Sequence, residues 1–310
     1  MESLNDIKKR IKSVTDISQM THAMQLVSAA KMRKSKAQHE MVSPFFTLCA
    51  ESLMELHKNS EDIDNPFLRM REKRAGETWK IGYFILTGDQ GLAGAYNNNI
   101  VKITEEHIQK KIMENAKKNI QTEYKLYVFG QMGSGKLKKD GYIVDPEFSF
   151  PITDPNYYEA RNVANIIRAK YLRGEFDLVY LIYTKMESAI SMKPVITRVV
   201  PIDTESLKNS FASGAEDAGI ALERGAHLDY YPDPEAVFSF LIDTGLNAVM
   251  YGAMVEAFAC EQTARMQAMD NANRNADEMM KDLTMKSNRA RQARITNELN
   301  EIVNGASQVE

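Results

Sequence analysis

Both ends of the chain are too long and too regular in sequence to belong to a compact domain. Residues 3–57 contain no glycine and a single proline, Pro44, and residues 253–304 contain neither glycine nor proline. At 1.5 Å per residue, a helix over 3–57 would span roughly 80 Å, and one over about 233–306 roughly 100 Å. We therefore predict two very long terminal helices, and Pro44 is the residue at which the first could kink.

Both stretches carry apolar residues at helical spacing. Ser3, three residues before Asp6, is the candidate cap of the first helix. The first stripe consists of Leu4, Ile7, Ile11, Val14, Ile17, Met20, Met24 and Val27. The second consists of Met266, Met269, Ala276, Met280, Leu283, Ala290 and Ile302. Neither helix can bury such a stripe alone, so we predict an antiparallel coiled coil of the N- and C-terminal helices. Serine, threonine, glutamine and alanine interrupt both stripes, so the pair would gain stability from surrounding protein.

The segment between the helices is rich in β-branched and aromatic residues. The strand-like runs are 80–87 (KIGYFILT), 125–129 (KLYVF), 176–184 (FDLVYLIYT) and 192–200 (MKPVITRVV). Helical stretches lie between them at about 97–118 and 156–173, and this alternation predicts a Rossmann-like α/β domain with a largely parallel sheet. Residues 203–232 are polar with scattered glycines, which indicates a long loop.

The overall charge gives no reason to expect binding to nucleic acid, because the formal net charge is −3. Locally, however, residues 1–36 hold eight basic and three acidic residues, and residues 281–294 hold five basic residues against Asp282. These stretches suggest an acidic protein partner, although a solvated helix face is the usual explanation of a charge run. The two cysteines, Cys49 and Cys260, fit unpaired thiols in a reducing compartment.

No segment of the sequence predicts a secretory signal, and no uninterrupted apolar run approaches the roughly 18 residues that span a bilayer. Any association with a membrane is therefore expected through partners.

Residues 130–137 (GQMGSGKL) come closest to a ligand-binding motif. They fit the phosphate-loop pattern G-x-x-x-x-G-K after a predicted strand, but Leu137 stands where serine or threonine would hold Mg²⁺. Gly141 would also end the required helix within two turns, so we expect a turn with chance glycines.

A second glycine-rich turn, residues 88–97 (GDQGLAGAYN), has the spacing G-x-x-G-x-x-G rather than the dinucleotide fingerprint. Its glycines are expected to permit tight turns and close packing of the following helix. The five histidines have no metal-binding spacing, and neither cysteine has an evident histidine partner in sequence. We therefore predict no catalytic residues, no metal and no cofactor.

Three motifs give the sequence a family resemblance. Residues 7–14 (IKKRIKSV) and 21–34 (THAMQLVSAAKMRK) resemble the N-terminal signature of the γ subunits of F-type ATP synthases. Residues 88–97 are similar to that family's G-D-x-G-L-x-G motif, with Gln90 where arginine is common. Residues 231–234 (YPDP), 261–269 (EQTARMQAM) and 288–306 resemble its C-terminal signature. Long motifs in the right order, covering nearly the whole chain, are far more specific than a lone glycine loop.

The resemblance implies a rotor shaft that has no active site of its own. In that family the paired helices turn inside a ring of α and β subunits, whose β subunits hold the catalytic sites. The α/β domain, together with the ε subunit, sits on the membrane c-ring, at the cytoplasmic face of the bacterial membrane. In that family an acidic loop of the β subunit contacts the shaft. By the same resemblance, the residues implied in partner contact and coupling are Met24, Lys31, Arg33, Arg289, Arg291, Gln292 and Thr296.

The expected divisions are an N-terminal shaft helix over 1–65, a globular α/β foot over 66–232 and a C-terminal shaft helix over 233–310. Arg294 and Ser287 depart from the family pattern, the 203–230 stretch looks long, and the chain has no closely spaced cysteine pair for a thiol switch. Two alternatives stay open on sequence: a coiled-coil adaptor whose α/β domain binds a nucleotide at 130–136, and a soluble enzyme within 66–232.

Overall fold

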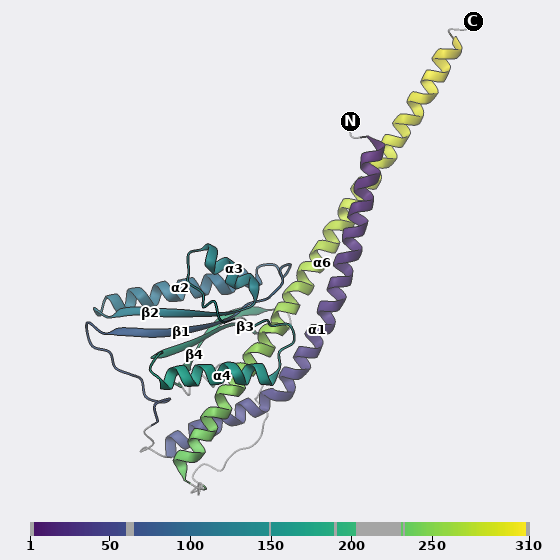
Figure 1. Ribbon diagram of the computed structural model, residues 1–310. Coiled ribbons are helices and arrows are strands. Elements are labelled where there is room, and N and C mark those ends of the chain that lie inside the picture. The colour runs from purple at the N-terminus through teal and green to yellow at the C-terminus, as the bar shows by residue number, and fades with distance from the viewer. Residues whose placement is uncertain are drawn as a thin grey trace. The chain divides into compact units, whose positions relative to one another are not determined.

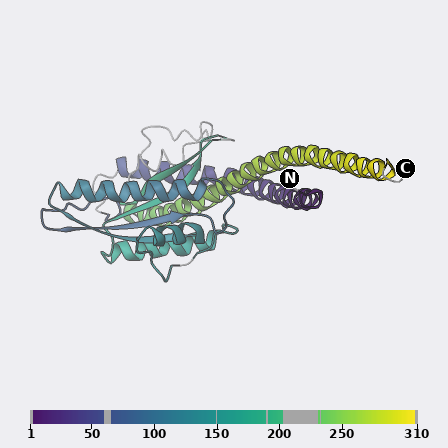
Figure 2. The ribbon, with the colours of Figure 1, turned by 90° about the horizontal axis from the view of Figure 1, so that it is seen from above.

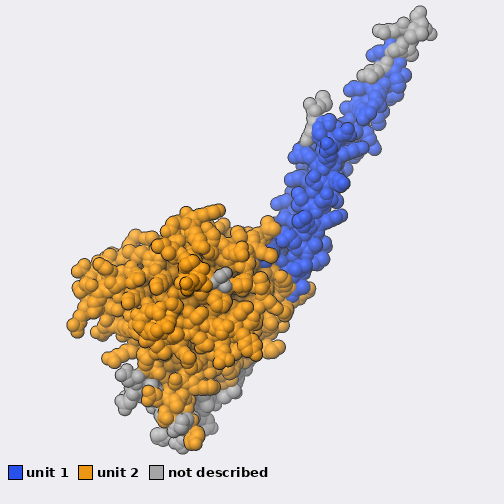
Figure 3. Space-filling model, viewed as in Figure 1, with its two compact units in different colours: residues 1–30, 265–310 blue, residues 31–264 orange. Residues whose placement is uncertain are grey.

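The computed structural model describes residues 3–59, 65–148, 150–188, 191–202, 231 and 233–307 (Figure 1). The predicted loop over 203–230 therefore lies outside the described residues. The chain divides into two compact units, which are described separately below (Figure 3). The first unit comprises residues 1–30 and 265–310, and the second comprises residues 31–264.

Two very long helices confirm the prediction for the chain ends. Helix α1 runs over Leu4–Asn59 and contains Pro44, and helix α6 runs over Pro234–Ser307. Ser3 caps α1 as predicted, because its Oγ accepts a hydrogen bond from the Asp6 N–H at 3.2 Å. Asp233 caps α6 in the same way, accepting from the Ala236 N–H at 2.8 Å.

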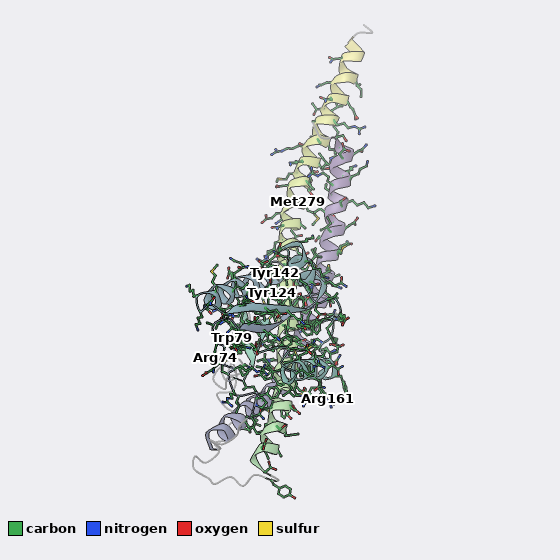
Figure 4. All side chains as sticks on the ribbon, turned by 60° about the vertical axis from the view of Figure 1, so that its left-hand side comes forward. Arg74, Trp79, Tyr124, Tyr142, Arg161 and Met279 are labelled. Carbon is green, nitrogen blue, oxygen red and sulfur yellow. The ribbon has the colours of Figure 1, made fainter. Side chains whose placement is uncertain are left out.

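In the first unit, α1 and α6 form an antiparallel pair (Figures 1 and 2). Thr15 contacts Met280, Thr21 contacts Asn273 and Gln25 contacts Asp270, so residue numbers rise along one helix as they fall along the other. Residues 291–300 of α6 are all exposed, and Met279 is also exposed (Figure 4).

The buried seam of α1 differs from the predicted stripe. Ile7 is buried and Leu4, Ile11, Val14 and Met24 are half-buried, as expected, but Ile17, Met20 and Val27 are each more than half exposed. A coiled-coil seam repeats every 3.5 residues, which leads from Val14 to Ser18, Thr21, Gln25 and Ser28. The predicted stripe took two steps of three residues after Val14, to Ile17 and Met20, and so left the buried face. Polar residues occupy the seam in its place.

The α6 stripe fits better. Met269, Ala276 and Leu283 are buried, and Met266, Met280 and Ala290 are half-buried. Ile302 is 68% exposed, so its place in the buried stripe was predicted wrongly. The contacts of α1 and α6 pair residues whose numbers add to about 295, so Ile302 lies beyond the residues that face Leu4.

The second unit contains a four-stranded sheet in the order β2-β1-β3-β4. Its strands are β1 (Thr78–Leu86), β2 (Gln121–Phe129), β3 (Leu178–Met186) and β4 (Met192–Val200). β1 pairs in parallel with β2 and β3, and β4 is an antiparallel edge strand. The largely parallel sheet is thus confirmed, with one antiparallel addition.

Helices cover both faces of this sheet (Figure 1). Alternate strand residues, such as Tyr83 and Ile85, pack with α2 (Tyr96–Ala116) and with Leu137 of α3 (Gln131–Lys139). The residues between them, such as Phe84, pack with α4 (Tyr157–Leu172) and with the first part of α6. The period of two along each strand therefore accounts for two separate apolar cores.

Helix α6 differs from the sequence-based expectation that no segment is long and apolar enough to span a membrane. A window within Glu235–Asn300 is long and apolar enough to cross a bilayer by length and composition, contrary to our expectation. Of that window, 56% is buried inside the structure. Phe238, Ile242 and Met254 of this helix are almost fully buried in the core against the sheet, which accounts for their apolar character.

One buried carboxylate, Asp177, ties the segment before β1 to the sheet. It accepts from Arg71 Nη1 at 2.9 Å, from Lys73 Nζ at 3.0 Å and from the Lys80 N–H at 3.0 Å. Burial alone would raise the pKa of Asp177, but these hydrogen bonds and charges outweigh it and hold the pKa below its usual value. Lys73 Nζ also lies 5.7 Å from the centroid of the Trp79 ring; Trp79 is labelled in Figure 4.

We expect Asp177→Ala to destabilise the protein by about 3 kcal/mol, because it strands two partly buried cations and a backbone N–H. The measurement is urea unfolding of the full chain at pH 7. Glu106→Ala, which removes an exposed i,i+4 pair with Lys102, is the matched control and should cost less than about 0.5 kcal/mol. Equal effects of the two substitutions would contradict the anchoring role.

Candidate functional site: the carboxyl edge of the sheet and the helix pair

An open parallel sheet usually binds ligands where the strand order reverses, at the carboxyl ends of its strands. Here that point lies between β1 and β3, since β1 connects onward to β2 on one side while β3 lies on the other. The glycine-rich turns singled out in the sequence follow β1 and β2 at this same edge. This edge is therefore the expected position of a ligand site in the second unit.

Helix α6 fills this position after β1. A Cβ atom on Gly88 would lie 2.7 Å from the carboxyl carbon of Glu261, so any other residue there would require that side chain to shift. Tyr96 donates its hydroxyl to the Ala257 carbonyl at 3.0 Å, and Glu256 Oε1 accepts from the Met186 N–H at 3.0 Å. The glycines thus permit close packing, but at Gly88 the packing partner is α6 rather than the helix that follows.

The turn after β2 was predicted wrongly as a turn without a helix. Helix α3 begins at Gln131, directly after Gly130, and includes both Gly133 and Gly135. Gly130 has φ +80, and a Cβ atom there would overlap the Thr87 carbonyl. A Cβ atom on Gly133 would overlap the Thr87 side chain. Close packing against Thr87 therefore accounts for two glycines of the phosphate-loop pattern, and nine residues sufficed for a helix before Gly141.

The backbone donors that a phosphate would need are already used by the protein. The Gln131 N–H donates to Asp89 Oδ1 at 3.2 Å, and the Gly133 N–H donates to Thr87 Oγ1 at 3.1 Å. The Met132 N–H donates to the Gly88 carbonyl at 3.1 Å. Lys136, which would reach the phosphates in a true phosphate loop, donates instead to Asn98 Oδ1 at 2.9 Å. This arrangement joins α3 to the turn after β1 and disfavours nucleotide binding.

The titratable side chains fit structural roles in the same way. Within residues 3–59, 65–148, 150–188, 191–202 and 233–307, no group of three His, Cys, Asp or Glu could hold a metal ion. His107 lies 3.1 Å from the Tyr83 hydroxyl, and burial lowers its pKa to about 4. Cys49 and Cys260 are free and buried, and burial raises the pKa of both thiols.

Glu256 is a buried carboxyl group of this site with a strongly raised pKa. Burial raises its pKa to about 7, partly opposed by the Met186 N–H and by the charge of Lys185. The ionised form is therefore disfavoured in the folded protein, and this costs stability at alkaline pH.

The residues implied in coupling lie on the two long helices. In the first unit, Met24 is half-buried on α1, and four residues are exposed on α6: Arg289, Arg291, Gln292 and Thr296. Thr296 donates its hydroxyl to the Gln292 carbonyl at 3.0 Å, which places both on one face of α6. In the second unit, Lys31 and Arg33 are exposed on α1. Arg294, a departure from the family pattern, pairs with Glu298 at 2.7 Å.

Sequence reasoning missed a set of polar contacts inside the helix pair. Thr21 and Gln25 of α1 contact Asp270 and Asn273 of α6. A strict heptad count from Ile7 would have placed Thr21 and Gln25 in the seam. Steps of about 3.5 residues from Ile7 reach Thr21 after four steps and Gln25 after five.

The fold and this site define the class of protein: two long helices pair in an antiparallel coiled coil, and one of them also packs into an α/β unit at its usual ligand position. The chain belongs to the ATP synthase gamma chain family. The family model described as ATP synthase matches residues 3–309. The ATP synthase gamma chain of Ruminiclostridium cellulolyticum is 39% identical over 99% of both chains. The sodium ion specific ATP synthase gamma chain of Acetobacterium woodii is 37% identical over 98% of both.

Solved structures agree on the fold. The central stalk and c-ring structure of the Tetrahymena thermophila mitochondrial ATP synthase contains a chain with a TM-score of 0.54 and 22% identity. The match covers 82% of this chain and 99% of that one.

We expect Glu256→Gln to stabilise the protein above pH 7. The pKa of the Glu256 carboxyl is about 4.5 in the unfolded chain and about 7 in the folded protein. The stability of the wild-type protein therefore falls as pH rises from about 4.5 to about 7, whereas the amide of the variant cannot ionise. The gain at pH 8 should approach about 3 kcal/mol and vanish near pH 4.5. Thermal unfolding across this range measures it.

Glu235→Gln, an exposed substitution on the same helix, is the control and should leave the pH profile of stability unchanged. If the stability of Glu256→Gln and of wild type changes with pH in parallel, ionisation of Glu256 does not destabilise the folded protein.

Proposed function

We propose that this chain is the central rotor shaft of a rotary F-type ATP synthase, carrying torque between a membrane c-ring and a ring of α and β subunits. The observation that carries the proposal is the antiparallel helix pair in a member of the gamma chain family, with α6 exposed over 291–300. An exposed helix of this length is explained by surrounding protein.

The proposed division of labour has three parts. Residues 1–65 and 233–310 supply the shaft, and residues 66–232 supply the foot that meets the ε subunit and the c-ring. The catalytic sites belong to the β subunits, and this chain supplies none. It acts at the cytoplasmic face of a bacterial membrane, which it reaches only through the complex.

Torque rather than chemistry fits the energetics. One ion crossing 100 mV supplies about 2.3 kcal/mol, so several ions must contribute to each ATP made. An element that accumulates their work has to resist melting, and a helix pair held within a ring of subunits does so.

Exposed cations on the helices are suited to transient contact with an acidic β-subunit loop. Lys31, Arg33, Arg289 and Arg291 are all exposed. Exposed ion pairs contribute only about 0–1 kcal/mol each, so such contacts can form and release in every turn. Met24, Gln292 and Thr296 complete the proposed coupling set.

The test of the proposal is assembly. The tagged chain, co-expressed with the α and β subunits of a related enzyme, should purify as one stoichiometric complex. A monodisperse chain that leaves both subunits behind would overturn the rotor assignment. Nucleotide titration addresses the adaptor alternative, which requires micromolar binding that Lys136→Ala abolishes.

We expect Met24→Lys to uncouple the assembled enzyme, because it places a fixed positive charge beside the acidic loop it must pass. ATP-driven ion pumping should fall several-fold relative to ATP hydrolysis, while assembly is retained. Met41→Lys, the same change at an exposed site farther along α1, is the control. A normal pumping-to-hydrolysis ratio in Met24→Lys would remove Met24 from the coupling set.

A further inference from the structure

A chain of hydrogen bonds crosses the seam of the helix pair in the first unit. Thr21 donates its hydroxyl to Asn273 Oδ1, Asn273 Nδ2 donates to Gln25 Oε1 at 3.0 Å, and Gln25 Nε2 donates to Asp270 Oδ1 at 3.1 Å. Arg274 closes the chain, since its Nη2 lies 2.8 Å from Asp270 Oδ2. These five residues are called the seam network below.

The donors and acceptors of the seam network run in one consistent sense. Asn273 uses both ends of its amide across the seam, its oxygen toward Thr21 and its nitrogen toward Gln25. Gln25 likewise accepts from Asn273 and donates to Asp270. Each amide is thus matched at both ends, which holds only while Thr21 and Gln25 face these two residues of α6.

The seam residues next to the network specify the register poorly. They are small or flexible side chains, namely Ser18, Ser28, Met269, Ala272, Ala276 and Met280. Alanine and serine leave shallow contacts, and methionine adapts its shape to different neighbours. If the helices slid by one heptad, similar side chains would meet again, so packing alone discriminates weakly between registers.

The seam network does discriminate. After a slip of one heptad, Thr21 would face Met280 or Met266, depending on direction, in place of Asn273. The amides of Asn273 and Gln25 would then lose each other within a part-buried seam. Unmatched buried amides are costly, whereas matched ones add little net stability. A polar pair in an otherwise adaptable seam therefore selects one register.

We propose that the seam network fixes the axial register of α1 against α6, and that Gln25 and Asn273 are its positioning residues. Its consequence for coupling rests on the proposed function: a shaft whose helices can slip would absorb rotation as sliding. The register itself is a property of this chain alone, so it can be tested without the other subunits.

The experiment measures register in the full chain by electron–electron double resonance. Nitroxide labels are attached at Lys9→Cys on α1 and Asn271→Cys on α6, both exposed, in a Cys49→Ala/Cys260→Ala background. The observed contacts place these sites about 15 residues, roughly 22 Å, apart along the helix axis. A slip of one heptad changes this separation by about 10 Å in either direction.

Gln25→Leu/Asn273→Leu is the test variant. It leaves Asp270 with Arg274 and leaves Thr21 with its own helix carbonyls, so no buried group loses its last partner. Wild type should give one narrow distance, and the variant a second population displaced by about 10 Å, with a melting temperature equal to or above that of wild type. One unchanged distance in the variant would overturn the proposal.

Two further variants sharpen the result. Gln25→Glu/Asp270→Asn transposes charge and amide, so every hydrogen bond can re-form, and it should keep the single wild-type distance. Ser18→Ala/Ser28→Ala removes seam hydroxyls outside the network and should also keep it. If either control slips as well, general seam polarity rather than the seam network sets the register. Should the leucine variant not fold, Gln25→Ala/Asn273→Ala carries the same test.

Register in the variant and assembly of the wild-type chain separate this inference from the proposed function. If Gln25→Leu/Asn273→Leu slips but the wild-type chain does not assemble with α and β subunits, the network stands and the rotor assignment fails. If the variant keeps its register but the wild-type chain assembles, the rotor assignment stands and the network fails.

Discussion

The burial of α6 is the interaction on which the rest of the structure depends. Its first part lies in the core of the α/β unit, where Phe238, Ile242 and Met254 are almost fully buried against the sheet. Its later part pairs with α1 through a seam of small and polar side chains. One continuous helix of 74 residues therefore has a strongly apolar end, fixed in a folded domain, and a weakly apolar end that needs a partner.

The change from a strongly apolar to a weakly apolar surface along α6 suits the proposed rotor. A shaft must be fixed firmly where it joins its foot, and it must turn freely where it passes other subunits. Large apolar side chains provide the first condition, because burying one contributes about 1.5–3 kcal/mol. Exposed cations provide the second, because each exposed ion pair is individually weak.

Much of the fold was predictable because its strongest signals are local. The absence of glycine over 3–57 predicted α1 almost to its ends, and 192–200 was predicted as a strand with the bounds that β4 has. Helix α3 was missed because Gly141 was expected to break a helix within two turns, whereas the nine residues Gln131–Lys139 form one before it. Packing against Thr87, which directly follows β1, accounts for the glycines at Gly130 and Gly133. The seam was missed beyond Val14 because Thr21 and Gln25 are polar, and their partners lie about 250 residues away in sequence. The proposed coupling residues rest on the family motifs, since nothing in local chemistry marks Met24 apart from Met20.

The fit between Gly88 and Glu261 bears on how such a domain can change over evolutionary time. The space that a parallel sheet commonly offers to a cofactor is here taken by a side chain of the same polypeptide, and any carbon added at Gly88 would require Glu261 to shift. A cofactor could enter only after α6 had been displaced, and displacing α6 would remove the core of its own domain. Substitutions at Gly88 and at Glu261 are therefore coupled, and each constrains what the other position can accept.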